Sequence, residues 1–290
     1  MRAAQSSKSN LGVLGPRTRA GAPCSRPLLA ILAIAGALIS AQIAGAADCP
    51  LSPQNAGSVA SVTDGRTFIL ADGRAVRLAM MEVPALPPPG AAPQPQTAAG
   101  ERSRKALEEL IGGKDLLLAQ FGADRFGRVL ARAYLSDSRG PKAVEASLLA
   151  AGLAFLSPYA GNQNCAADLI AAERAARGAK LGLWADADFT TRNADDPDAV
   201  RLARGHFAIV EGKVVSVRES GATIYVNFGR RWDQDFTVTI SKRNERLFAG
   251  SGLTPKSLAG RRVRIRGVIE ERGGPWIEAI RPGQIEIVDR

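Results

Sequence analysis

The chain has 290 residues, with 38 Lys and Arg against 28 Asp and Glu, and 46% of its residues are hydrophobic. This length allows about two domains of ordinary size, and the apolar content excludes a wholly disordered chain. Three cysteines exclude a disulfide-rich scaffold, and a single histidine, His206, excludes a metal site built on a histidine pair.

The N-terminus has the pattern of a secretory signal peptide. Residues 1–46 hold five basic residues and no acidic one, with an apolar run at 28–41 followed by Ala44-Gly45-Ala46. We expect cleavage there, export of the remainder to the periplasm or the medium, and no stable membrane insertion afterwards. The alternative is a retained N-terminal anchor, because residues 28–47 are long enough to cross a bilayer.

Export changes the interpretation of the cysteines. Cys24 is lost with the signal peptide, which leaves Cys49 and Cys165. In an oxidising compartment we predict a disulfide between these two, and closing so long a loop stabilises the fold by about 4–5 kcal/mol in the chain-entropy model. The alternative is two free thiols.

The positive charge is concentrated in the C-terminal part of the chain. Residues 47–200 have 16 basic and 18 acidic residues, whereas residues 201–290 have 17 basic and 10 acidic residues. Any footprint for a polyanion is therefore expected in the C-terminal part. The polar, acidic stretch 190–199 is typical of a linker, so we predict domains at 47–189 and 205–290, joined by a linker over 190–204.

The first domain is predicted to be α+β. Asp-Gly turns at 64–65 and 72–73 separate short β-rich runs, and the proline-rich stretch 84–95 leads into a segment with helical periodicity. The expected strands are 57–62, 67–70, 75–83, 115–121 and 129–135, and the expected helices are 98–111, 141–151 and 166–177. This order predicts a five-stranded barrel with helices packed outside.

Five segments of this domain resemble the thermonuclease (staphylococcal nuclease-like) family. They are SVASVTDGRTFIL, DGRAVRLAMMEVP, DRFGRVLARAYL, the helix at 144–152 with GLAF, and AERAARGAKLGLW. The resemblance covers roughly residues 57–184 and implies an OB-type barrel with helices. It also implies a calcium-dependent phosphodiesterase acting on DNA and RNA, with carboxylates on the metal, a glutamate as general base and two arginines on the phosphate.

Three catalytic positions of the family are retained or nearly so. By this resemblance Arg77 and Arg128 match the two phosphate arginines, and Glu82 stands at a metal aspartate with one methylene more. Three other positions decide the activity. Asp64 stands at the first aspartate of the family's turn, Arg66 replaces the second, which is a metal ligand, and Ala85 stands where the catalytic glutamate belongs.

These replacements predict an impaired or absent calcium-dependent nuclease. Losing a general base costs ~10²–10⁴-fold in rate, and Arg66 with Glu82 leaves no net negative charge for a cation. Arg66 is expected either to pair with Glu82 where the metal would lie, or to form with Arg77 and Arg128 a cationic pocket for phosphate. We expect no cofactor; Asp64 and Glu82 are weak metal candidates, and calcium would bind only at a rearranged site. We expect Gly65 to have no role beyond forming its turn.

The second domain is predicted to be a small OB-type β-barrel. Strands are expected at 207–217, 222–228, 236–240, 262–268, 276–280 and 284–288. Because successive side chains of a strand point to opposite faces of the sheet, Arg262, Arg264 and Arg266 are expected on one face. With Arg230, Arg231 and the aromatic candidates Tyr225 and Trp232, this face is expected to bind single-stranded nucleic acid. The alternatives are a solvated face balanced by glutamates (Glu270, Glu271, Glu278 and Glu286) or binding of another anionic envelope component. His206 is expected to pack beside Phe207.

Three functions follow as hypotheses. The first is an exported pseudoenzyme that binds nucleic acid, phosphate or another polyanion without efficient cleavage. The second is an active secreted nuclease with a rearranged metal site, and the third is an envelope protein that binds protein or glycan. The sequence gives no prediction of oligomeric state.

Overall fold

The computed structural model describes residues 52–90, 95–136, 138, 140–158, 166–231 and 233–288. Gly45–Arg290 is one compact unit. The expected signal peptide, the anchor alternative, Cys49, Cys165 and Trp232 lie outside the described residues. Within the described part of the chain, no helix is long and apolar enough to cross a membrane.

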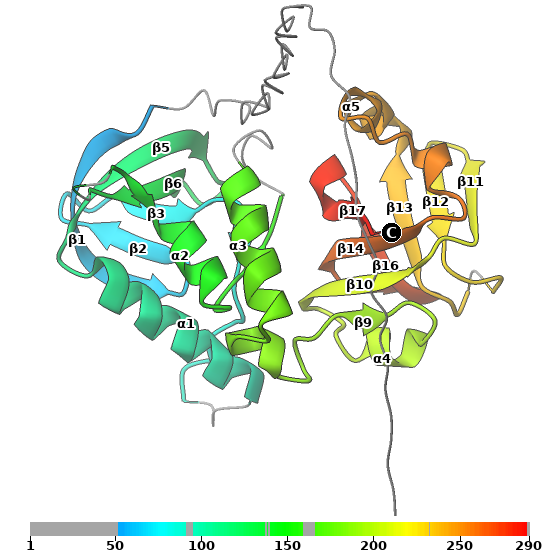
Figure 1. Cartoon of the computed structure of the whole chain (residues 1–290), viewed down its shortest axis with the longest axis horizontal. Helices are drawn as coiled ribbons and strands as arrows, with labels where there is room; N and C mark the ends of the chain where they lie inside the picture. The colour runs from blue at the N-terminus through cyan, green and yellow to red at the C-terminus, as the bar shows by residue number, and fades with distance from the viewer. Residues whose placement is uncertain are drawn as a thin grey trace, which may run out of the picture. The chain divides into compact units, whose positions relative to one another are not determined.

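Five strands form the first barrel (Figure 1). They are β1 Gln54–Asp64, β2 Thr67–Leu70, β3 Ala75–Leu78, β5 Asp115–Ala123 and β6 Val129–Leu135. The sheet order is β3-β2-β1-β5-β6, and an additional parallel pairing of β3 with β6 closes it. A short sixth strand, β7 Lys142–Ala143, pairs with the outer side of β6. The predicted five-stranded barrel is confirmed.

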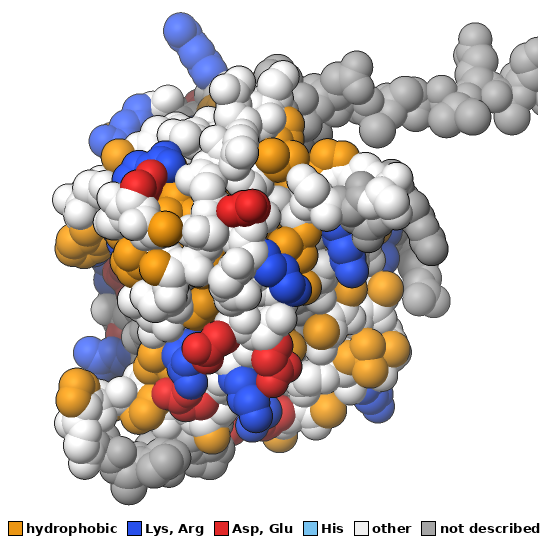
Figure 2. All heavy atoms as spheres, turned by 90° about the vertical axis from the view of Figure 1, so that its left-hand side faces the viewer, with side chains coloured by type: hydrophobic (Ala, Val, Ile, Leu, Met, Phe, Trp, Pro, Cys, Tyr) orange, Lys and Arg blue, Asp and Glu red, His pale blue; other side chains and the backbone are white. Residues whose placement is uncertain are grey.

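Helices pack against this barrel as the apolar periodicity predicts. They are α1 Pro95–Ile111, α2 Val144–Ala150 and α3 Ala167–Gly178, followed by the short 3-10 helix η2 Gly182–Ala185. Leu107 and Ile111 of α1 are fully buried and join Phe68, Leu70 and Leu118 of the barrel in one core. Basic and acidic side chains alternate on the outer face seen in Figure 2, consistent with a first domain of nearly balanced charge.

The strand predicted over 75–83 is divided in two. Met80 adopts a left-handed backbone conformation with φ of 62°, which breaks the strand after β3. The following strand, β4 Met81–Glu82, leaves the barrel and pairs with β8 Phe155–Leu156, with Glu82 opposite Phe155. This break places Glu82 beside the barrel rather than within its wall.

Gly65 does more than form its turn, so the assignment to the turn alone is wrong. Its φ lies outside the left-handed region, and a Cβ added there would lie 2.6 Å from the Cβ of Ser103 on α1. Glycine is therefore needed because the β1–β2 turn approaches the helix closely. The same contact fixes where Arg66, the next residue, begins its side chain.

The second barrel is built from two sheets. One has the order β17-β14-β10-β9 and the other β11-β12-β13-β16-β15. The bounds are β9 Arg192–Asn193, β10 Phe207–Lys213, β11 Ser216–Ser220, β12 Thr223–Asn227, β13 Thr237–Ser241, β14 Arg262–Val268, β15 Glu270–Arg272, β16 Gly274–Glu278 and β17 Ile285–Ile287. Helix α5 Glu245–Gly250 and the 3-10 helices η3 Lys242–Asn244, η4 Pro255–Leu258 and η5 Pro282–Gln284 lie in the connections.

The two sheets share one bent strand. The expected strand 207–217 divides at Val214 and Val215: Val214 bonds to the chain before β14, whereas the Val215 N–H donates to the Asn227 carbonyl at the end of β12. β13 and β16 then pair in parallel, as β3 and β6 do in the first barrel. The second region thus has the OB-type strand order, and its core includes Phe236, Phe248 and Ile265.

The segment 190–204, expected as a linker, is folded onto the second barrel. β9 pairs in parallel with β10, and Val200 of helix α4 Pro197–Arg201 is fully buried in the second core. Asp196 caps α4 by accepting a hydrogen bond from the Ala199 N–H at 3.0 Å, and Pro197 follows it in the first turn. An Asp-Pro helix start was present in the sequence, but the polar composition favoured a linker.

The two barrels share a small apolar cluster. It joins Phe155, Leu183 and Trp184 of the first barrel to Ile209 of the second, with Phe189 and Phe207 packed against it. Beside the cluster, Arg266 of β14 reaches Glu173 of α3. Apolar packing and a buried ion pair therefore hold the barrels together within one unit.

Candidate functional site

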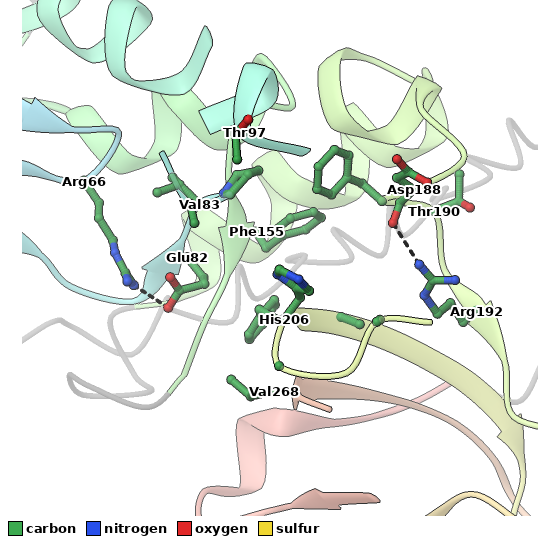
Figure 3. A pocket seen from close by; sticks show the side chains of 17 residues that line it. Arg66, Glu82, Val83, Thr97, Phe155, Asp188, Thr190, Arg192, His206 and Val268 are labelled. Carbon is green, nitrogen blue, oxygen red and sulfur yellow. Dashed lines mark hydrogen bonds and ion pairs between the residues drawn. The ribbon is translucent and has the colours of Figure 1, made fainter. Parts of the chain in front are cut away.

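The β1–β2 turn directs Arg66 toward Glu82. Asp64 Oδ1 accepts a hydrogen bond from the Arg66 N–H at 2.8 Å, which closes the turn. The Arg66 guanidinium then forms an ion pair with the Glu82 carboxylate (Figure 3). Both side chains are largely buried, with exposures of 17% and 19%. The predicted Arg66–Glu82 pair is confirmed.

Arg77 approaches the same carboxylate from β3. Its Nη2 lies 3.8 Å from Glu82 Oε2, too far for a hydrogen bond. Burial, and then the charges of Arg66 and Arg128, lower the pKa of Arg77, and Glu82 opposes this shift. Arg66 and Arg128 are therefore close enough to Arg77 to disfavour its positive charge. An anion placed among them would relieve that repulsion.

Arg128 is held on the β5–β6 hairpin. Its guanidinium bonds to Asp124 Oδ2, with Nη2 at 2.7 Å and Nε at 2.8 Å. The ring of Phe126 at the hairpin tip is 67% exposed and has the guanidinium carbons of Arg125 and Arg128 at 4.8 and 5.2 Å. Sequence analysis missed Phe126; an aromatic residue flanked by arginines in a predicted turn was the available signal.

Calcium, which the family resemblance implies, does not fit these residues. The Glu82 carboxylate is engaged by Arg66, and Asp64 Oδ1 closes the turn. Among the described residues, no group of three or more His, Cys, Asp or Glu side chains could hold a metal ion. Ala85 is exposed and offers no proton acceptor. A hard cation needs several anionic oxygens, and here a guanidinium takes the place of one.

A pocket of about 290 Å³ lies beside the ion pair. Its polar lining includes Arg66, Glu82 and His206, and its apolar lining includes Phe155, Phe189 and Phe207. Figure 3 shows the Arg66–Glu82 pair and His206 along the same cavity, with Phe155 above His206 in the view. Both barrels contribute, because Phe155 belongs to β8 whereas His206 and Phe207 begin the second barrel.

The side chain of His206, which we expected to pack beside Phe207, lies at the protein surface. It is exposed and lines the pocket. Its backbone is held between Ala203 and Ile269, with its N–H donating to the Ala203 carbonyl at 2.9 Å and its carbonyl accepting from the Ile269 N–H at 3.0 Å. Because this turn precedes β10, the imidazole stays at the edge of the barrel and projects into the pocket.

Comparisons with known proteins identify the family of the first barrel. The family model described as staphylococcal nuclease homologue matches residues 75–186. "Protein ParB" of Escherichia coli is 30% identical over 138 residues, which are 45% of this chain and 72% of that protein. An "Uncharacterized endonuclease" of Escherichia coli is 31% identical over 133 residues, 46% of this chain and 78% of that protein. The chain belongs to the staphylococcal nuclease homologue family.

The second barrel lies outside the part that matches the staphylococcal nuclease homologue family. On its strand β14, Arg262, Arg264 and Arg266 share one face, as the period predicts, but carboxylates compensate them. Arg264 bonds to Glu211 at 2.7 Å and Glu286 at 3.0 Å, and Arg262 bonds to Glu211 at 2.9 Å. The alternative of a charge-balanced face named four glutamates, of which Glu286 bonds to Arg264 here; Glu211 was not foreseen.

Arg266 is not part of an exposed basic row. It is 3% exposed and pairs with Glu173 of α3 in the family domain. The nucleic-acid role expected for the arginine row stays a prediction. Tyr225, 36% exposed, lies on β12 in the other sheet, and Trp276 is buried with Arg272 over its ring at 3.7 Å.

Proposed function

We propose that this staphylococcal nuclease homologue binds the phosphates of nucleic acid through Arg66, Arg77 and Arg128 and does not hydrolyse them with calcium. The Arg66–Glu82 ion pair carries the proposal. It places a permanent positive charge where the family resemblance implies a metal ligand, so that the site attracts an anion rather than a cation. Loss of the base at Ala85 removes the acceptor for the proton of an attacking water.

Arg77 is the side chain best suited to receive the phosphate. Its guanidinium approaches the Glu82 carboxylate only to 3.8 Å, and its neighbours Arg66 and Arg128 disfavour its positive charge. A phosphate oxygen would supply the missing hydrogen-bond acceptor and offset this repulsion. Forked guanidinium groups match a phosphate in two-point contacts.

Two assays test the proposal on the full chain. In the first, single-stranded DNA and RNA are incubated with calcium and either the wild type or the double variant Arg66→Asp, Ala85→Glu. We expect no calcium-stimulated cleavage by the wild type and a gain by the double variant, with each single variant as a control. Calcium-dependent cleavage by the wild type would overturn the proposal.

The second assay measures binding of a fluorescent single-stranded oligonucleotide as salt is varied. Arg77→Ala should weaken binding roughly tenfold, since hydrogen bonds to charged groups are worth about 1.5–3 kcal/mol, and should lower the salt slope by about one. Arg74→Ala is the matched control, because Arg74 lies on the same barrel and pairs with Asp72 at 2.7 Å. Absence of any binding to nucleic acid would leave an envelope protein or glycan ligand as the alternative.

A second candidate function is hydrolysis at a rearranged site. One relative from Escherichia coli is named as an endonuclease, which favours this candidate. It requires Glu82 to exchange its arginine partner for a metal, with Asp64 as a further ligand. Metal-dependent digestion of DNA that Glu82→Gln abolishes would establish this candidate in place of the first.

We also propose that the protein is exported to the periplasm or the medium and carries the Cys49–Cys165 disulfide. The signal-peptide pattern of residues 1–46 supports this proposal. N-terminal sequencing of the cell-fractionated protein should find a start near residue 47. Thiol titration of the denatured, unreduced protein should find no free thiol, and two thiols per chain would contradict the disulfide.

A further inference from the structure

The pocket beside the arginines has the chemistry of a site for a planar ring. We propose that it binds one nucleobase of a single-stranded nucleic acid, so that the second barrel contacts the base next to the phosphate held by the first. This inference rests on the proposed phosphate binding. It assigns part of the contact with the base to residues of the second barrel, His206 and Phe207.

The apolar wall of the pocket is a group of aromatic rings. The ring centroid of Phe155 lies 6.1 Å from that of Phe189 and 5.8 Å from that of Phe207, with the planes tilted at 42° and 34°. Phe155 is itself fixed edge-on against Trp184 at 5.2 Å. Phe189 and Phe207 are partly exposed, so aromatic surface remains available in the pocket. Bases of any identity stack on such surface.

Hydrogen-bonding groups stand at the edge of the pocket. The His206 imidazole is exposed and, among the described residues, no hydrogen bond to it is found. Its ring nitrogens offer one donor and one acceptor when neutral. Asp188 also lines the pocket and is exposed. Donors and acceptors beside a stacking surface are what recognition of an unpaired base requires.

The volume of the pocket limits which form of nucleic acid can enter it. At about 290 Å³ it is at the lower end of the range for small-molecule sites. It therefore has room for a single base with part of its sugar and cannot admit a duplex. The Arg66–Glu82 pair lines the same pocket, so at least one of the arginines proposed to bind phosphate, Arg66, lies in the pocket wall.

Packing between the barrels assembles the pocket before a ligand binds. Phe155 comes from the first barrel, whereas Phe189, His206 and Phe207 lie after the residues that match the family model, 75–186. The buried Arg266–Glu173 pair and the shared apolar cluster hold the two walls together. A preformed pocket avoids part of the ordering cost of binding.

The test compares two probes that differ only in the base. Adenosine 5′-monophosphate and ribose 5-phosphate are titrated calorimetrically into the full chain. We expect the nucleotide to bind at least about tenfold more tightly. His206→Ala and Phe189→Leu should each reduce the ratio of the two affinities to about twofold while leaving the affinity for ribose 5-phosphate unchanged. His206 is exposed, so its variant will fold, and leucine keeps apolar volume at 189 without a flat ring.

Two control variants separate this inference from the proposed function. Leu247→Ala removes an exposed apolar side chain of α5, outside the pocket, and should leave the ratio of the two affinities unchanged. Arg77→Ala should weaken both probes by the same factor. Equal affinities of the wild type for the two probes would overturn the base site but not phosphate binding. A nucleotide preference that survives His206→Ala and Phe189→Leu would also overturn it, and binding of neither probe would overturn both proposals.

Discussion

Arg266 and Glu173, 93 positions apart in the chain, form a fully enclosed ion pair between the two barrels. Arg266 Nη1 lies 2.8 Å from Glu173 Oε2 and 3.1 Å from Oε1. The backbone of Leu156 completes the arrangement: its N–H donates to Glu173 Oε1 at 2.7 Å, and its carbonyl accepts from Arg266 Nη1 at 3.0 Å. The pair thus joins α3, β8 and β14.

Removing one partner should strongly destabilise the protein. Arg266→Ala leaves Glu173 buried without its counterion, and breaking a buried pair costs about 3–5 kcal/mol. The free energy of unfolding, measured with urea, should fall by this amount. The double variant Arg266→Met, Glu173→Met should recover much of the loss, because apolar residues of similar volume replace the charges.

An exposed pair across the same boundary provides the control. Arg174 Nη2 lies 3.3 Å from Glu286 Oε1, and the Arg174 side chain is 66% exposed. Arg174→Ala should therefore change the free energy of unfolding by less than about 1 kcal/mol. If Arg266→Ala were equally mild, the barrels would not be held together by this pair.

Glu145 should make stability depend on pH. Its carboxyl is fully buried in the first turn of α2; burial raises its pKa from 4.5 to about 8, although Arg132 opposes the shift. The folded state then keeps this proton between pH 4.5 and about 8, where the unfolded state has lost it. Stability should accordingly fall as the pH rises through this range, by up to about 1.4 kcal/mol per pH unit.

The variant Glu145→Gln isolates this contribution, because its amide is neutral at every pH. Between pH 5 and 8 the free energy of unfolding of the wild type should fall relative to that of the variant. Above pH 8 the difference between the two should be constant. A difference independent of pH would contradict the raised pKa. Glu108→Gln, an exposed site on α1, serves as the matched substitution.

Gly152 is needed for close packing as well as for its backbone conformation. Its φ is +68°, and a Cβ there would lie 2.2 Å from the Leu181 carbonyl oxygen. Gly113 has nearly the same φ, +69°, with nothing within 4 Å of an added Cβ. Gly113→Ala should cost about 1–2 kcal/mol of stability from the left-handed conformation alone. Gly152→Ala should cost clearly more stability. Equal losses of stability in thermal unfolding of the two variants would show that the backbone at Leu181 moves away from an added Cβ at little cost.

Much of the fold was predictable because its signals are local. Asp-Gly turns and alternating apolar residues located most of the barrel strands, and the glycines after Ile111 and Ala151 located helix ends. The break at Met80 was not predictable, since a non-glycine residue with positive φ has no sequence signature. That break moves Glu82 onto β4 and so decides the geometry of the site.

The site was predictable only where the family positions supplied it. The Arg66–Glu82 pair was predictable because, by the family resemblance, both residues stand where metal-binding aspartates would lie. The pocket was not predictable, because it depends on how the second barrel packs against the first. Arg266 and Glu173 each occur in segments that look solvent-facing in isolation: an arginine alternating with apolar residues and a glutamate in an alanine-rich helix. Their burial requires contact between segments far apart in the chain, which no local pattern reports.

Phe126 should contribute to binding single-stranded nucleic acid. It is an exposed ring at the β5–β6 hairpin tip, held between Arg125 and Arg128, and Arg128 is one of the arginines that we propose bind phosphate. Base stacking on an exposed aromatic side chain is worth about 1–3 kcal/mol, so Phe126→Ala should weaken oligonucleotide binding by at least fivefold. Phe126→Tyr should retain the affinity, because the ring remains.

Leu202→Ala is the control for loss of an exposed apolar side chain, because Leu202 is 77% exposed on the second barrel. Thermal unfolding of all three variants should match the wild type within about 0.5 kcal/mol, and unchanged affinity of Phe126→Ala would restrict binding to the arginines.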